Sequence, residues 1–122
     1  MQNYRRGTME TVTWTNGTGS DVSAGDPVWL DGRIGIACVD IDNGDDGAVA
    51  VTGVFRLAKD TSTAFTQGQD VDWDDSESEC GSLGAGESDD LLHIGKADVA
   101  ADASDAYLDV DINVPETAEK VA

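Results

Sequence analysis

The chain has 122 residues, of which 25 are Asp or Glu and 7 are Lys or Arg, and its net charge is −18. A chain of this length forms one domain with at most short tails. So large an excess of acid excludes binding to nucleic acid through a basic surface, and it excludes attraction to an anionic membrane.

The acidic residues are unusual in kind, because Asp outnumbers Glu by 19 to 6 and Lys occurs only at Lys59, Lys96 and Lys120. Repulsion among so many carboxylates destabilises a compact state in dilute buffer. Molar salt shortens the screening length to roughly 3 Å and removes most of this penalty. The composition therefore favours a protein adapted to high salt, with an ordinary acidic surface protein as the alternative.

The first half of the chain predicts strands separated by turns. Residues 1–9 form an N-terminal arm, and residues 10–15 alternate as a strand. Residues 28–30 and 33–41 predict two further strands, joined by a tight hairpin at Asp31-Gly32.

The segment "GAVAVTGVFRLAKD" (Gly47–Asp60) predicts one long strand. Its alternation changes phase near Gly53, where we expect a bulge or tight bend because glycine tolerates the backbone that a kink requires. A short helical turn is expected around Ala64 and Phe65.

The second half predicts three more strands, an acidic exposed loop and a tail. The strands are expected at residues 70–75, 91–100 and 106–114, the loop at 74–90 and the tail at 115–122.

Short strands with a turn signal every 8–12 residues are typical of small β-domains. We therefore predict an all-β fold over residues 10–114, a small antiparallel β-barrel or sandwich with an extended N-terminal arm. A start without an apolar run does not predict a signal peptide, and no run is long enough for a membrane span.

The sequence contains no recognisable catalytic constellation. His93 is the single histidine, and Cys38 and Cys80 lack the spacing of a metal motif. No serine lies in a G-x-S-x-G setting. The glycine-rich segment 81–88 lacks the Lys-Ser/Thr end of a phosphate loop and lies among carboxylates. We expect neither an enzyme nor a cofactor.

Calcium is the one chemical ligand to consider. Asp70, Asp72 and Asp74 occupy the first, third and fifth positions of an EF-hand-like run. Asp75 and Gly81 stand where that motif requires Gly and Glu, so the motif fails. These three Asp are weak cation candidates, and a solvated acidic surface is the stronger interpretation.

An ordered set of short motifs resembles a known family. The set begins with "MQNY" and continues with "G-D-x-V" (Gly25–Val28), "G-R-I-G-I-A" (Gly32–Ala37) and "G-V-F-R-L-A-K" (Gly53–Lys59). It ends with "Q-G-Q-D-V-D-W-D" (Gln67–Asp74), "I-G-K-A" (Ile94–Ala97) and an alternating strand. Over residues 1–114 the chain resembles the capsid cement, or head-decoration, proteins of tailed phages, a family sometimes labelled as phage RecA/RadA recombinases.

The resemblance implies a structural virion protein on the outer surface of a mature capsid, which it stiffens. The implied partners are the major capsid protein and further copies of the chain in a homotrimer. The recombinase label has no support in the sequence, because a Walker A motif and a basic DNA surface are both lacking. Together with the salt signature, the acidic insert at 74–90 suggests a virus of a halophilic host.

The expected capsid or subunit contacts are few. The arm carries Tyr4, Arg5 and Arg6 and could add a strand to a neighbouring sheet edge, although a disordered tail is the alternative. Arg56 and Lys59 are expected to contact carboxylates of a neighbour, or else to be solvated. Contacts near a trimer axis are expected from residues that flank the kink, which are Val54, Phe55 and Leu57.

A second functional hypothesis is a host-surface or glycan-binding module displayed on a virion. Exposed aromatic side chains would favour it, and Trp14, Trp29 and Trp73 are the candidates. Each of them lies in a strand register that could bury it.

Overall fold

The computed structural model describes residues 4–114 and 119–121, and they form strands and turns without a helix. The strands are β1 (Tyr4–Arg6), β2 (Thr11–Thr15), β3 (Pro27–Trp29), β4 (Ile34–Ala37), β5 (Asp46–Ala50), β6 (Val54–Ala58), β7 (Asp70–Asp74), β8 (Glu79–Gly81), β9 (Leu91–Ala97), β10 (Tyr107–Ile112) and β11 (Glu119–Lys120). The described part of the chain therefore contains no helix that could span a membrane.

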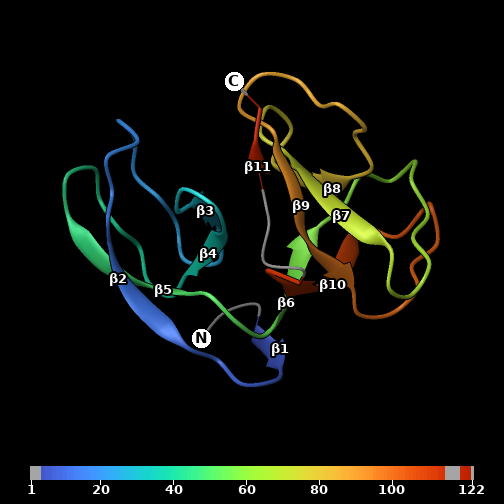
Figure 1. Ribbon diagram of the computed structural model, residues 1–122, viewed down its shortest axis with the longest axis horizontal. Helices are drawn as coiled ribbons and strands as arrows, with labels where there is room; N and C mark the ends of the chain where they lie inside the picture. Colours follow the sequence, from blue (N-terminus) through green and yellow to red (C-terminus); the bar gives the residue numbers. More distant parts are fainter. Residues whose placement is uncertain (1–3, 115–118, 122) are drawn as a thin grey trace.

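The strands form two antiparallel sheets that face each other in a sandwich-like arrangement (Figure 1). The large sheet has the order β1-β6-β10-β9-β7-β8, and β11 pairs with β9. The small sheet has the order β2-β5-β4-β3. The all-β prediction is confirmed, and of its two forms the sandwich is correct, because the sheets do not close into a barrel.

The main core lies between the two sheets. Ile34 and Ile36 of β4 are fully buried against large-sheet side chains such as Phe55 and Val110. A smaller cluster on the other side of the small sheet contains Val28, Ala37, Ile41 and Val49. The strand β4 is therefore buried on both faces, which explains why its sequence is apolar without alternation.

The central glycine of β4 is required by this packing. A Cβ atom on Gly35 would lie 2.8 Å from the Cγ2 atom of Val49 and 3.2 Å from the Cδ1 atom of Leu30. Both distances are shorter than ordinary van der Waals contact, so any larger residue would push the small sheet apart.

The predicted long strand from Gly47 to Asp60 is wrong, whereas the predicted bend at Gly53 is confirmed. The segment forms β5 in the small sheet and β6 in the large sheet. Gly53 has a φ of +122°, which is available to glycine and strained for other residues. The change of phase in the apolar alternation near Gly53 therefore marks the point where the chain crosses from the small sheet to the large sheet.

Other local predictions have mixed outcomes. The hairpin at Asp31-Gly32 is confirmed, because β3 pairs with β4 and both turn residues have positive φ. The helical turn around Ala64 and Phe65 is wrong. Phe65 instead forms an isolated antiparallel bridge to Ala101, and its ring is buried in the main core.

The two ends of the chain both reach the large sheet. The segment Tyr4–Arg6 of the predicted arm pairs with β6 of its own chain, and Glu119–Lys120 of the predicted tail pairs with β9. Residues 1–3, 115–118 and 122 lie outside the described residues. The predicted acidic loop, residues 74–90, contains the short strand β8 with Cys80 buried at its centre.

Candidate functional site

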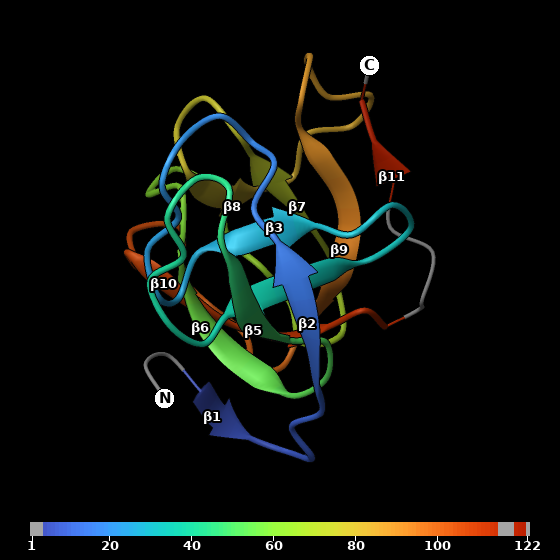
Figure 2. The same cartoon turned by 90° about the vertical axis from the view of Figure 1, so that its left-hand side faces the viewer.

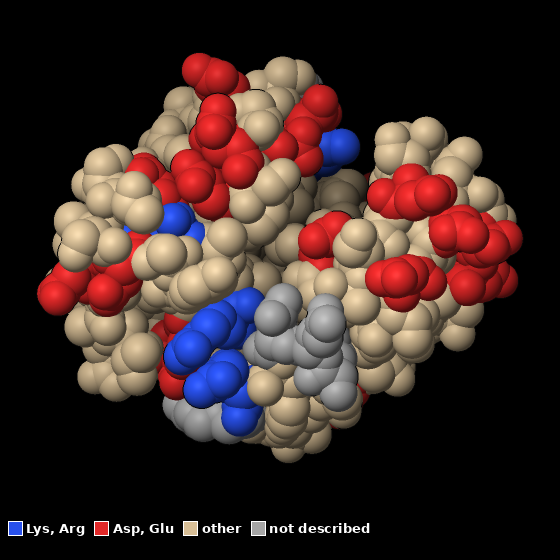
Figure 3. All heavy atoms as spheres, turned by 180° about the vertical axis from the view of Figure 1, so that it is seen from behind, with Lys and Arg blue, Asp and Glu red and all other residues tan. Residues whose placement is uncertain are grey.

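A small basic surface lies on the outer face of the large sheet. The Nε atom of Arg56 lies 3.0 Å from one carboxylate oxygen of Asp109, and the Nε atom of Arg5 lies 4.0 Å from the other. Figure 3 shows the largest group of blue side chains in the lower part of the view, whereas red side chains, with smaller blue areas among them, are spread over the rest. We call Arg5, Arg56 and Asp109, together with the neighbouring Tyr107, the basic patch.

Strand register brings these residues together. On β6 the side chains of Phe55 and Leu57 face the core, so Arg56 between them faces outward. On β10 the pattern is the same, and Asp109 stands directly opposite Arg56 in the ladder. Tyr107 follows on the same face and is 61% exposed.

The charges in the patch do not cancel. One carboxylate is shared by two guanidinium groups, and both arginine side chains are nearly half exposed, at 47% for Arg5 and 44% for Arg56. The hydrogen bond from Arg56 to Asp109 raises the pKa of Arg56, which keeps this guanidinium charged at every relevant pH. The patch therefore combines a fixed positive charge with an exposed aromatic ring.

Tyr4 anchors β1 beside the patch. Its ring contacts Phe55 edge to face, with ring centroids 5.6 Å apart and an interplanar angle of 63°. Its hydroxyl donates a hydrogen bond to the carbonyl of Gly7. The predicted contact residue Tyr4 is thus half-buried, and it holds Arg5 in position. Arg6 lies in β1 opposite Val54, and its side chain is outside the description.

Four predicted contact residues are buried within the chain itself. Val54, Phe55 and Leu57 are at most 3% exposed. Phe55 and Leu57 form the core face of β6, and Val54 is buried at the start of the strand, outside the main core cluster. Lys59 is 2% exposed, and its ammonium donates hydrogen bonds to the carbonyls of Asp60, Thr63 and Ala103. These side chains present almost no surface to a neighbour, so Arg5 and Arg56 are the exposed side chains among the predicted contact residues that the structure describes.

Each of the three cation candidates is engaged with protein groups. Asp70 forms an ion pair with Lys96. Asp72, which is 7% exposed, accepts hydrogen bonds from the backbone N–H groups of Leu83 and His93, both at 2.9 Å. Asp74 accepts hydrogen bonds from the turn that follows β7. In residues 4–114 and 119–121, no group of three or more His, Cys, Asp or Glu side chains could hold a metal ion.

The remaining reactive residues do not form a catalytic arrangement with one another. His93 is exposed, and its Nδ1 atom lies 3.8 Å from a carboxylate oxygen of Asp70. Cys38 and Cys80 are both free thiols. Burial raises the pKa of the Cys80 thiol far above its usual value, which makes that thiol a poor nucleophile.

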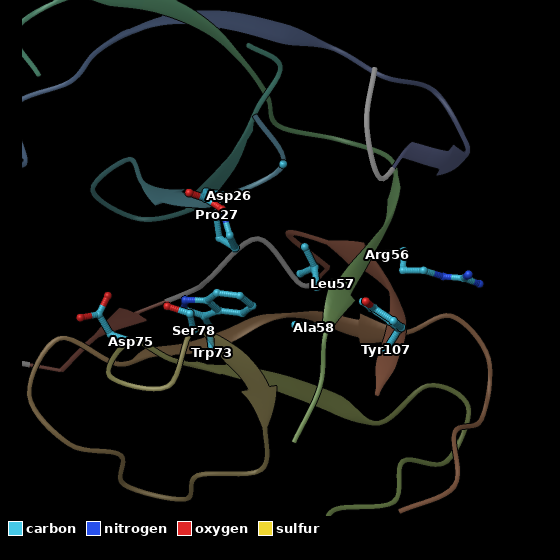
Figure 4. Close-up of a pocket in the computed structure, with 10 residues that line it drawn as sticks. Asp26, Pro27, Arg56, Leu57, Ala58, Trp73, Asp75, Ser78 and Tyr107 are labelled. Atoms are coloured by element: carbon cyan, nitrogen blue, oxygen red, sulfur yellow. The ribbon is translucent and has the colours of Figure 1, made fainter. Parts of the chain in front are cut away.

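A groove of about 350 Å³ opens between the two sheets next to the basic patch. Asp26 and Pro27 line it from the small sheet, and Trp73 lines it from the large sheet. Figure 4 shows Arg56 and Tyr107 at the opposite end of the groove from Asp75 and Ser78, with the Arg56 side chain extending away from Trp73. The groove continues the patch toward the gap between the sheets.

The tryptophans give no exposed aromatic platform. Trp73 is 9% exposed, and Trp14 and Trp29 are half-buried against the two core clusters. The exposed aromatic side chain of the patch is Tyr107. Tyr107 and Asp109 were not among the predicted contact residues, although the clean alternation of residues 106–114 puts both side chains on one face of their strand.

A sandwich-like all-β domain with a polar, charged outer patch and engaged carboxylates has the features of a binding or structural protein. A comparison with family models confirms this class: residues 6–114 match the model of the phage cement protein family. The match covers most of the chain, so the protein belongs to the phage cement protein family, as its motifs predict. None of the curated proteins compared with the chain matches it.

This membership supports a structural role associated with the capsid of a virion, with capsid components as partners. It gives no support to the recombinase label or to the prediction of a halophilic host.

Proposed function

We propose that the protein decorates the outer surface of a tailed-virus capsid and stabilises the shell by binding the major capsid protein through the basic patch. Membership of the phage cement protein family supports the capsid-associated role. The observation that carries the proposed orientation is the pairing of Arg5 and Arg56 around one carboxylate in a chain with a net charge of −18.

The charge distribution favours this face over the others. A strongly acidic protein is repelled by an acidic neighbour wherever its own carboxylates come close. Arginine side chains at the contact reverse that repulsion locally, and their planar donors suit carboxylate partners. The partner chemistry that fits is therefore an acidic, hydrogen-bond-accepting surface on the capsid protein.

The exposed ring beside the charges adds an anchor. Tyrosine and arginine are enriched among the residues that contribute most to interface energy. Tyr107 presents most of its ring to solvent on the same face as Arg56, so both can be covered by one partner. The homotrimer and the position on the outer surface belong to this proposal and rest on the family resemblance.

The patch can be tested by neutralising its charges. The double substitution Arg5→Gln and Arg56→Gln should lower affinity for purified undecorated capsids about tenfold or more, because two exposed charge contacts are lost. The measurement is occupancy on capsids by co-sedimentation. Gln is preferred to Glu because a new carboxylate beside Asp109 would add repulsion within the fold.

The matched control is Arg33→Gln, which removes one positive charge from the exposed hairpin tip between β3 and β4. This variant should bind capsids as the native chain does. Equal binding by the native and double-variant chains would reject the basic patch as the capsid contact. If Arg33→Gln lost capsid binding as the double variant does, capsid binding would depend on net charge and not on the basic patch.

A further inference from the structure

The outer edge of the small sheet is open. Strand β2 is the terminal strand of that sheet and pairs only with β5 among the described strands. It lies on the side of the molecule turned away from the large sheet (Figure 2). All its residues are exposed except Trp14, which is half-buried.

The hydrogen-bonding direction of β2 follows from its neighbours. The N–H of Val51 donates to the carbonyl of Glu10, and the N–H of Asn16 donates to the carbonyl of Asp45. Hydrogen-bonded and non-hydrogen-bonded pairs alternate along an antiparallel ladder. The even-numbered residues of β2 therefore bond to β5, and Thr11, Thr13 and Thr15 direct their backbone N–H and C=O groups outward.

The other edge of the small sheet is protected. Its terminal strand β3 begins with Pro27, which has no N–H to offer a new strand. Prolines and charged side chains are the usual means by which natural sheets block their edges. Strand β2 has neither, because its sequence is Thr-Val-Thr-Trp-Thr.

This sequence is complementary to itself. When two copies pair antiparallel with Thr13 opposite Thr13, Thr11 lies opposite Thr15, and Val12 lies opposite Trp14. Threonine pairs and aromatic pairs with β-branched residues are favourable across strands. Glu10 then lies opposite the neutral Asn16 of the other copy. In this register no two carboxylates of β2 and its flanking residues face each other.

The absence of charge on β2 indicates which partner strand suits this edge. Each copy has a net charge of −18, so two copies can approach only where few carboxylates meet. The five residues of β2 carry no charge, and Val12, which is 37% exposed, supplies apolar surface beside Trp14. A basic or acidic partner strand would find no complementary charge on this edge.

We infer that β2 pairs with β2 of a second copy across a twofold axis at Thr13, which joins the two small sheets into one continuous sheet. This contact goes beyond the proposed capsid binding, because it links one copy of the chain to another through residues that are not part of the basic patch. The interface is short, so we expect weak association in solution that is strengthened when copies are held close together on one surface.

Substitution of Thr13 by proline tests the contact in the free, full-length protein. Thr13→Pro removes an N–H that the ladder directs away from β5, and it places a ring at the centre of the interface. The variant should associate about tenfold more weakly than the native chain in sedimentation equilibrium, and Thr13→Ser should associate as the native chain does. Equal self-association of the native chain and Thr13→Pro at protein concentrations up to about 1 mM would overturn the inference.

A charge-swap experiment tests the register. Thr13→Lys and Thr13→Asp should each weaken self-association, because the twofold axis brings two like charges face to face. A mixture of the two variants should recover association to within about threefold of the native chain. Thr61→Lys, which changes an exposed threonine outside β2, is the control and should associate as the native chain does.

Two results would contradict the second copy as occupant. Failure of the mixture to recover would exclude a twofold axis at Thr13. Loss of capsid binding by Thr13→Pro without any change in self-association would assign the edge to a capsid-protein strand instead. Neither result bears on the basic patch, whose arginine variants leave β2 intact.

Discussion

Asn113 connects the two sheets through its side chain. It follows β10 in the large sheet, is 6% exposed and has a φ of +58°. Its amide nitrogen donates to the carbonyls of Ile34 and Val51, at 2.9 and 2.8 Å, and its amide oxygen accepts from the N–H of Ile34 at 2.9 Å. Asparagine suits this position because it tolerates left-handed backbone and both donates and accepts hydrogen bonds.

Replacement of this side chain should therefore be strongly destabilising. We expect Asn113→Ala to lower the free energy of unfolding by about 3 kcal/mol or more, because three buried backbone groups lose their partner. Asn113→Gly loses the same hydrogen bonds but relaxes the backbone, so it should be about 1 kcal/mol less damaging than Ala. Urea unfolding followed by tryptophan fluorescence measures both values. Stability of the Ala variant within about 0.5 kcal/mol of the native chain would show that the sheets are held together without this bridge.

Single residues also mark the limit of what the sequence predicts. The strand pattern places Phe55 and Leu57 on one face of β6, yet it says nothing of which face is covered. Lys59 is the clearest case, because an isolated lysine at a strand end normally predicts exposure. Its burial depends on hydrogen bonds to the carbonyls of Asp60, Thr63 and Ala103. The local sequence around Lys59 does not show that these carbonyls surround its ammonium group.

At the scale of elements, the acidic segment 74–90 is ordered by its own carboxylates. Asp90 is 4% exposed, and its two oxygens accept hydrogen bonds from the N–H groups of Asp75 at 3.0 Å and Glu87 at 2.7 Å. Asp72 ties Leu83 to β9 in the same way. The composition predicts a solvated loop here, but buried carboxylates that accept backbone hydrogen bonds cannot be distinguished from solvated ones by composition.

Two carboxylates of this segment should respond in opposite directions to neutralisation. Asp90→Asn should destabilise the protein by about 1–3 kcal/mol, because an amide can accept only one of the two hydrogen bonds well. Partial burial and the nearby Asp89 raise the pKa of Asp75, so its charged form is disfavoured in the folded state. Asp75→Asn should therefore stabilise the protein slightly at neutral pH.

The pH dependence checks the sign of the second effect. A carboxyl whose folded-state pKa is raised reduces stability only while it is ionised, so the reduction is present above the folded pKa and disappears below the unfolded pKa. The difference in melting temperature between native and Asp75→Asn chains should shrink as the pH falls through this range. A stabilisation by Asp75→Asn that persisted at a pH where Asp is protonated would point to a cause other than charge.

The sequence predicts where strands lie along the chain better than it predicts which strands pair with one another. Most strands from residue 10 to residue 114 occur where alternation and turn residues place them, because those signals are local. Strands β1, β8 and β11 escape prediction since each has at most three residues. The partners of β1 and β11 are also distant in sequence, whereas β8 pairs with the neighbouring β7 inside a polar, glycine-rich segment. The division of Gly47–Asp60 between two sheets is likewise a long-range outcome.

For the whole molecule, the dominant physical fact is its net charge of −18. We expect the melting temperature to rise strongly between 0.1 M and 2 M NaCl, because the screening length falls from about 10 Å to below roughly 3 Å. A chelator added at constant ionic strength should leave the melting temperature unchanged if the carboxylates are solvated or bonded to protein. A melting temperature that is flat across this range of salt would exclude charge repulsion as a major limit on stability, and a clear effect of the chelator would indicate a bound cation.

The path of the chain through the small sheet also sets an order of assembly. Pairing of β1 with β6 joins residue 6 to residue 54, and every strand of the small sheet lies in the loop between them. Closure of a loop carries an entropic penalty that grows with its length. The small sheet removes most of that penalty when it forms, because the hydrogen bond from Val51 to Glu10 already holds the two ends of the loop together. We therefore expect β1 to be added late in folding, so that the basic strand docks onto a framework whose core-forming strands are already in place.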